Sequence, residues 1–200
     1  MPLVEQAELP AAGGVVEHVR VVYIQNGRSD LGDFAFLQIR KRSMLAATVI
    51  SSQAIYGKRL VTAPKELAEM VAGPFEAIVA PTSGSPELIE PYFRALREKF
   101  PSLRDLSPFV ARGGSVEASD SDVSTQDVKR DMNVGSPNLD GISSLLFVDD
   151  VFGRGKTAAA LLSSLHDAGL NAKCKMTVAV PLFMGPERGP SLIDTIKAMS

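Results

Sequence analysis

Hydrophobic and polar positions follow two different patterns along the chain, and the change falls near residue 73. Residues 15–51 contain runs rich in β-branched and aromatic residues, VVEHVRVVYI, FAFLQIRK and MLAATVIS, and turn-forming residues at 27–32 interrupt them. This pattern predicts two or three antiparallel strands. Pro64 then opens a short predicted helix, PKELAEMVA, which the pair Gly73-Pro74 ends.

From residue 74 onward, predicted strands and helices alternate. Strands are predicted at 76–80, 107–112, 144–149 and 174–180, and helices at 86–100 and from about 156 to Gly169. Such alternation favours a parallel sheet with helices on both faces. We therefore predict an α/β fold with two parts, a doubly wound core at 74–200 and an N-terminal β-rich extension at 1–73. Two hundred residues with 45% hydrophobic content can bury one sizeable core of this kind.

The strand predicted at 144–149 ends in two adjacent carboxylates, Asp149 and Asp150, and a glycine-containing loop separates them from a helix. The loop consists of Val151, Phe152, Gly153, Arg154, Gly155, Lys156 and Thr157. A helix that begins at its end points unpaired backbone N–H groups back into the loop, where they bind an anion. Glycines let a phosphate approach the backbone, and carboxylates accept hydrogen bonds from hydroxyls or attract Mg²⁺. The pattern indicates a sugar-phosphate site. An ordinary strand and helix joined by a glycine turn is the alternative, and charged groups at the end of an apolar strand weigh against it.

A second candidate loop follows the strand at 76–80. It contains Thr82, Ser83, Gly84 and Ser85, and Ser85 and Pro86 fit the first positions of a helix. Two such helix starts on neighbouring parallel strands would face one crevice, where ligands of open α/β sheets bind. On its own, this loop is equally well explained as a plain strand-to-helix turn.

The stretch 113–141 is polar and has no sustained apolar period. Structureless connections of this length are uncommon unless they act as lids or are disordered, so we expect a long flexible loop. Lys129 and Arg130 are its only basic residues, and a solvated surface insertion remains the alternative explanation for them.

Residues 145–157, LLFVDDVFGRGKT, resemble the diphosphosugar-binding motif of the type I phosphoribosyltransferases. The resemblance covers mainly residues 75–182, and the family usually has hydroxyl residues where this chain has Gly153 and Arg154. It implies that Asp149 and Asp150 face the ribose of phosphoribosyl pyrophosphate (PRPP), with Mg²⁺ held there through ribose or water. By the same resemblance, loop 151–157 holds the 5′-phosphate and residues 82–85 contact pyrophosphate. Lys129 and Arg130 would close over the leaving pyrophosphate from a flexible catalytic loop.

The implied activity is that of a Mg²⁺-dependent pentosyltransferase of nucleotide metabolism. Pyrophosphate on C1 of PRPP is displaced by a nitrogenous base or amine, and residues 1–72 or the tail after 180 would read that acceptor. Two alternatives stay open. Some relatives with this fold bind the ligand as non-catalytic regulators, and the altered Gly153-Arg154 pair suits that role. Gly155-Lys156-Thr157 also matches the end of a nucleoside triphosphatase phosphate loop, but the opening glycine of that pattern is Asp150 here.

Charge and composition narrow the partners and the compartment. The net charge of −2 argues against a broad basic surface for nucleic acid, and no apolar run approaches membrane-spanning length. The start shows no secretory signal, and Cys174, the single cysteine, lies in an apolar stretch that predicts a buried thiol in a reducing compartment. We expect a cytoplasmic protein with small-molecule ligands. The resemblance allows a homodimer.

Overall fold

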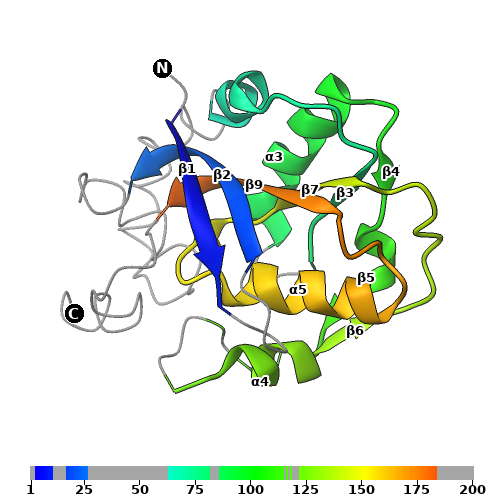
Figure 1. The fold of residues 1–200 in the computed structure, drawn as a ribbon. Helices are drawn as coiled ribbons and strands as arrows, with labels where there is room; N and C mark the ends of the chain where they lie inside the picture. Colours follow the sequence, from blue (N-terminus) through cyan, green and yellow to red (C-terminus); the bar gives the residue numbers. More distant parts are fainter. Residues whose placement is uncertain are drawn as a thin grey trace.

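A single twisted sheet forms the centre of the computed structural model, which describes residues 3–10, 17–26, 63–81, 86–114, 116, 118 and 122–183. In this part of the chain the sheet has seven strands in the order β1-β2-β9-β7-β3-β4, and β8 pairs with β9 (Figure 1). The strands are β1 Leu3–Leu9, β2 Glu17–Asn26, β3 Ala77–Val79, β4 Arg104–Asp105, β7 Ser144–Val148, β8 Val151–Phe152 and β9 Lys175–Phe183. Only the β1–β2 pair is antiparallel among them. The predicted α/β class with a mostly parallel core is confirmed.

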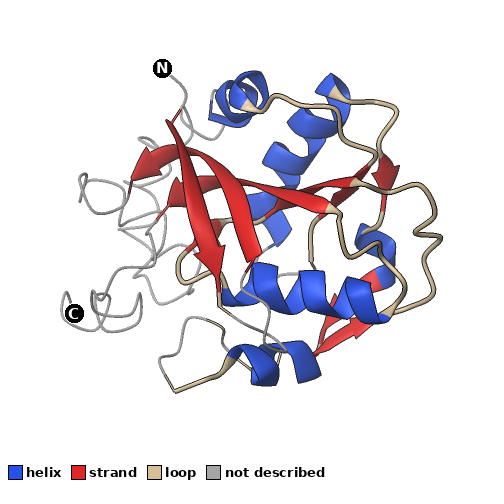
Figure 2. Cartoon of the chain, in the orientation of Figure 1, coloured by secondary structure: helices blue, strands red, loops and turns tan. Residues whose placement is uncertain are grey.

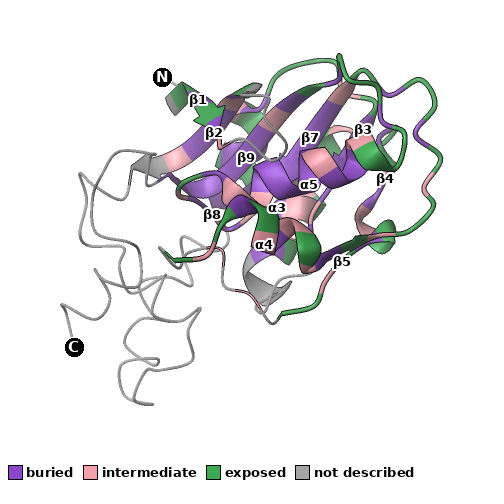
Figure 3. Ribbon diagram, turned by 60° about the horizontal axis from the view of Figure 1, so that its bottom comes forward, coloured by how far each residue is buried: buried purple, intermediate pink, exposed green. Residues whose placement is uncertain are grey.

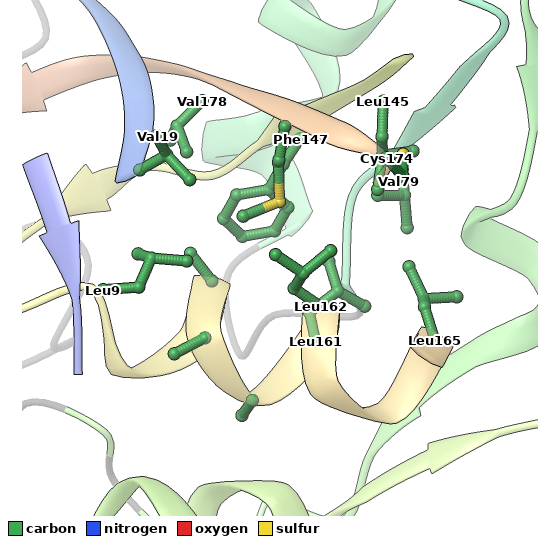
Figure 4. Close-up of a cluster of buried hydrophobic side chains, with 14 of the residues drawn as sticks. Leu9, Val19, Val79, Leu145, Phe147, Leu161, Leu162, Leu165, Cys174 and Val178 are labelled. Carbon is green, nitrogen blue, oxygen red and sulfur yellow. The ribbon is translucent and has the colours of Figure 1, made fainter. Parts of the chain in front are cut away.

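Helices cover both faces of this sheet (Figure 2). On one face, α5 (Lys156–Asp167) packs with Leu145 and Phe147 of β7 in a large apolar cluster. On the other face, α3 (Pro86–Lys99) and a helix over residues 63–70 pack with Leu146 and Val148. Because successive residues of β7 point to opposite faces, its unbroken apolar run is explained by burial on both sides. Figure 4 shows Phe147 between the strands and Leu161, Leu162 and Leu165 of α5.

A smaller two-stranded sheet stands outside the main one, and here two predictions are wrong. The strand predicted at 107–112 begins as a 3₁₀ helix, η2 (Ser107–Phe109), and only β5 (Val110–Arg112) is extended. β5 pairs antiparallel with β6 (Met132–Val134), which lies inside the stretch predicted to be structureless. That stretch also contains α4 (Thr125–Arg130). The buried side chains of Val128 and Met132 join both elements to the main core, and so few apolar anchors produce no visible period in the sequence.

The N-terminal strands belong to the same sheet as the parallel strands. β1 and β2 form an antiparallel pair, as predicted for this region, although β1 lies upstream of the predicted runs. β2 then pairs in parallel with β9. The division at residue 73 therefore cuts through one sheet, and as a domain boundary it stays a prediction. The runs at 34–41 and 44–51 lie outside the described residues.

The remaining elements follow the prediction closely. β3, β7 and β9 lie at the predicted positions, as do α3, α5 and the helix at 63–70. Cys174 is buried. Among the helices that the structure describes, none combines the length and the apolar character needed to cross a membrane.

Candidate functional site

The acid pair lies directly beyond the carboxyl end of β7, but its two members have different environments. The Asp149 backbone N–H donates to the Ala179 carbonyl at 3.3 Å, which continues the contact with β9. The Asp149 carboxylate in turn accepts the Asp150 N–H at 2.9 Å. Asp149 is half-buried, whereas Asp150 is only 1% exposed. Asp149 is thus the member of the pair that reaches solvent, and Asp150 belongs to the interior.

The loop that follows is anchored at its start by an aromatic stack. Phe152 lies in β8 opposite Phe183 of β9, with ring centroids 5.8 Å apart, and Phe183 stacks on Tyr23 of β2 at 4.7 Å. All three rings are buried. Phe152 therefore fixes where the loop leaves the sheet. Arg154, two residues further, is exposed.

Gly155 determines how α5 begins. It is the N-cap residue of the helix and has a left-handed backbone with φ of 71°. A Cβ there would lie 3.0 Å from Leu9 Cδ2 and 3.0 Å from Phe152 Cζ, so a side chain would fit only if these neighbours shifted. Because glycine offers no capping side chain, the N–H groups of the first turn of α5 are not capped by the N-cap residue. A Cβ on Gly153, in contrast, would meet nothing within 4 Å. The loop is therefore open at Gly153 and closely packed at Gly155.

At its far end, α5 closes with a Schellman motif. The Leu170 N–H donates to the Leu165 carbonyl at 2.8 Å and the Gly169 N–H to the His166 carbonyl at 3.0 Å. Gly169 has the positive φ that this motif requires, 105°. The predicted start and end of the helix are confirmed, and its N-terminus points to the end of β7. The positive end of the helix dipole therefore lies beside the loop.

The second candidate loop leaves the same edge of the sheet. β3 and β7 are parallel neighbours, with Val79 opposite Phe147, so both strands end side by side. Thr82, Ser83, Gly84 and Ser85 themselves lie outside the described residues, and their role stays a prediction. α3 begins at Pro86 as predicted.

Sequence reasoning missed two residues that support this loop. The Ala80 N–H, at the end of β3, donates to Ser107 Oγ at 2.9 Å, and the Ser107 N–H donates to Asp105 Oδ1 at 2.9 Å. This chain of bonds fixes the backbone at the point where the second loop starts. An Asp two residues before a Ser is a turn signal that the strand prediction over 107–112 obscured.

Three predicted site residues, Lys156 in loop 151–157 and Lys129 and Arg130 in the stretch 113–141, contact protein groups in this structure. Lys156 Nζ donates to the Val123 carbonyl at 2.5 Å. Lys129 forms an ion pair with Asp167 at 2.6 Å and donates to Ser163 at 2.8 Å, on the C-terminal half of α5. Arg130 pairs with Asp127 at 3.3 Å on its own helix. Closure of Lys129 over a ligand at the other end of α5 would require its contacts to break, and that role stays a prediction.

A Mg²⁺ ion beside this loop would meet one carboxylate that reaches solvent, Asp149, because Asp150 is only 1% exposed. Within the described residues, no group of three or more His, Cys, Asp or Glu side chains could hold a metal. Mg²⁺ usually takes one or two carboxylates and completes its shell with water and substrate phosphates. Asp149 fits that mode of binding, in which the substrate and water supply most of the ligands.

Comparison with known proteins gives structural similarities of low degree. No family model matches the chain, and no curated protein sequence matches it. A hypoxanthine phosphoribosyl transferase from Trypanosoma cruzi is 18% identical over 66% of this chain and 69% of its own, with a TM-score of 0.45. An adenine phosphoribosyltransferase from Thermoanaerobacter pseudethanolicus is 14% identical over 68% and 86%, with a TM-score of 0.42. The adenine phosphoribosyltransferase of Leishmania tarentolae is 10% identical over 70% of this chain and 75% of its own, with a TM-score of 0.38. At these values the similarities carry no argument about the site or the reaction.

Proposed function

We propose that this chain binds PRPP and transfers its phosphoribosyl group to a nitrogen nucleophile, with release of pyrophosphate. One observation carries the proposal. Three features follow β7 in order: an acid pair, an open glycine loop and the N-terminus of α5, which has no side-chain cap. All three lie beside the end of the parallel strand β3. The motif LLFVDDVFGRGKT supports the choice of PRPP among sugar phosphates.

The proposed roles follow from the positions of the groups. The backbone N–H groups at the start of α5 bind the 5′-phosphate, and Gly153 leaves room for it to approach. Asp149, the half-buried acid, accepts hydrogen bonds from the ribose hydroxyls. Asp150 is buried next to it in the chain, and the two acids together position the ribose. Mg²⁺, if carried by PRPP, would neutralise charge on the leaving pyrophosphate.

The reaction exchanges one bond at C1. The bond from C1 to the pyrophosphate oxygen breaks, and its electron pair leaves with pyrophosphate. The nitrogen lone pair of the acceptor forms the new bond to C1, and the proton on that nitrogen is lost to solvent or to a carboxylate. Water must be kept from the oxocarbenium-like ribose, because it would attack C1 in the same way.

A second candidate function is that of a regulator which binds PRPP without turnover. Arg154 favours it, because an exposed guanidinium stands where the family has a hydroxyl residue close to the phosphate. A triphosphatase is disfavoured by two observations. Asp150 occupies the position of the opening glycine, and Lys156 is directed to the Val123 carbonyl. That third candidate predicts that Lys156→Ala abolishes ATP binding while Asp149→Asn has a mild effect.

Turnover is tested by measuring pyrophosphate release from Mg²⁺-PRPP with a panel of acceptors. The panel contains the purines hypoxanthine, adenine and guanine and the pyrimidines uracil and orotate, because the sequence assigns no acceptor. We expect release with at least one acceptor, and a fall of roughly ten- to a hundredfold in Asp149→Asn, in line with the loss of a charged hydrogen-bond partner.

The control is Asp140→Asn, an exposed carboxylate before the opposite, N-terminal end of β7, which should leave the rate unchanged. PRPP binding without release for any acceptor would establish the regulator instead. Absence of PRPP binding would rule out both.

A further inference from the structure

Two lysines fasten α4 to α5, one near each end of the contact. Lys156 lies in the first turn of α5 and donates to the Val123 carbonyl, just before α4. Lys129 lies in α4 and bonds to Ser163 and Asp167, near the end of α5. The two helices lie against each other in two views of the molecule (Figures 1 and 3). The segment around α4 is therefore attached to the same helix whose N-terminus forms the anion site.

The contact made by Lys156 falls at the point where α4 starts. Val123 packs against the main core, and the next residue, Ser124, is the N-cap of α4. Ser124 accepts the Asp127 N–H, and the Ser124 carbonyl accepts the Val128 N–H at 3.2 Å. Displacement of Val123 would thus disturb the bonds that begin the helix.

The chemistry of this contact differs from that of a phosphate-binding lysine. An ammonium that donates to a carbonyl makes a charge-assisted hydrogen bond, which is stronger than a neutral one. Lys156 is half-buried, so water competes less for it than on an open surface. Backbone N–H groups and the helix dipole can hold a phosphate at this helix end without the ammonium. The side chain is therefore available for a structural contact at the rim of the site.

We propose that Lys156 is a positioning residue, which ties the start of α4 to the first turn of α5 and so links ligand binding there to the order of residues 122–131. The link rests on the proposed function, since PRPP is the ligand expected at this helix end. A ligand that orders the first turn of α5 then also holds Val123, and α4 becomes more protected. Without the tether, the ligand would order the loop alone.

Amide hydrogen exchange by NMR tests the tether without any ligand. The reporters are the amides of Asp127 and Val128, whose bonds begin α4. We expect Lys156→Met to speed their exchange about tenfold. Loss of a charge-assisted hydrogen bond would make local opening of this segment easier by about that factor. Lys156→Arg should restore slow exchange, because the guanidinium can also donate to the carbonyl. Lys173→Met is the control for loss of a lysine charge at an exposed position and should behave as the wild type. Unchanged exchange in Lys156→Met, or no rescue by arginine, would overturn the proposal.

The same amides, measured with saturating Mg²⁺-PRPP, test the link. We expect the ligand to slow their exchange in the wild type and in Lys156→Arg, but not in Lys156→Met. If PRPP also slowed amide exchange in Lys156→Met, Lys156 would not link ligand binding to the order of α4, and this part of the proposal would be wrong. Calorimetry on the same samples separates the two proposals. Absence of PRPP binding to the wild type contradicts the proposed function, while the exchange without ligand still decides whether Lys156 is a tether.

Discussion

Gly153 and Gly155 have different structural roles, although they are two residues apart in the same loop. Gly155 needs its left-handed backbone, and its missing Cβ makes room for Leu9 and Phe152. Gly153 has no such neighbours and faces open space. Gly155 is therefore required by the fold, whereas Gly153 is explained better by a ligand that approaches the loop.

Alanine at each glycine separates these roles. We expect Gly155→Ala to lower the free energy of unfolding by about 1–3 kcal/mol, from a strained φ and a contact at 3.0 Å. Gly153→Ala should change it by less than about 0.5 kcal/mol, the usual range at an open surface position, and should weaken PRPP binding. Urea denaturation and calorimetry measure the two effects. Equal losses of stability in the two variants would contradict the assignment.

Tyr23 supplies a prediction about pH. Burial, the hydrogen bond to Glu5 at 2.8 Å and the negative charge of Glu5 together raise the Tyr23 pKa from 10.0 to about 12. The folded state thus keeps the phenol proton to a higher pH than the unfolded state does. The stabilisation is complete below the ordinary pKa of 10.0 and is lost as pH rises through about 12.

The measurement is the urea midpoint across this alkaline range, in the wild type and in Tyr23→Phe. We expect the wild type to lose stability more steeply than the variant between these two values. Glu5→Gln should bring the Tyr23 pKa closer to its ordinary value, because it removes the carboxylate charge. Parallel pH profiles for all three proteins would show that Tyr23 titrates normally.

At the scale of elements, α4 depends on its capping box. Hydrogen bonds from the Ser124 hydroxyl and backbone N–H lower the pKa of Asp127, with a smaller contribution from Arg130. A carboxylate with a lowered pKa stabilises the folded state above its ordinary pKa, and that contribution is lost as pH falls through the lowered value. We expect α4 to loosen in acid before the main sheet does. Asp127→Asn should remove this pH dependence of the Val128 amide exchange, whereas Asp140→Asn, at an exposed turn, should not.

The elements around the site were predictable, and those in the middle of the chain were not. β7 and α5 are recognisable because an apolar run meets two acids, and because Leu161, Leu162 and Leu165 recur at helical spacing. β4 and β8 have only two residues each, too few for any pattern. α4 and β6 are apolar only at Val128, Met132 and Val134, and their placement depends on packing against α5 and β5. Tertiary contacts decide such segments, and a single sequence does not display them.

β1 was overlooked for a different reason. In its sequence, LVEQAEL, two apolar residues precede two polar ones, so alternation covers only the last four residues, in which Ala7 and Leu9 are buried. Some site residues could likewise be predicted from the sequence, and others could not. The acid pair and the loop could be found from sequence, because chemistry-bearing residue types cluster there. The role of Ser107 could not, because it depends on the Ala80 N–H, just beyond β3 and 27 residues away in the chain.

For the whole molecule, the continuity of the sheet across residue 73 has a direct consequence. β2 pairs with β9 along six residue pairs, so residues 74–200 alone would expose an edge of the central sheet and the apolar residues beneath β2. We expect this fragment not to fold by itself, and the full chain to unfold in a single transition by far- and near-ultraviolet circular dichroism. A folded fragment, or two separate transitions, would instead support a domain boundary at residue 73.

The PRPP site that we propose consists of the acid pair and the start of α5. It is tested most directly by calorimetric titration of Mg²⁺-PRPP into the wild type, into Asp149→Asn and into the double variant Asp149→Asn, Asp150→Asn, with ATP as the comparator ligand. Circular dichroism confirms that each variant is folded, which matters because Asp150 is buried. We expect the wild type to bind PRPP and not ATP, and we expect PRPP affinity to fall in Asp149→Asn and further in the double variant. Heat from ATP alone, or PRPP binding that is indifferent to both carboxylates, would contradict it.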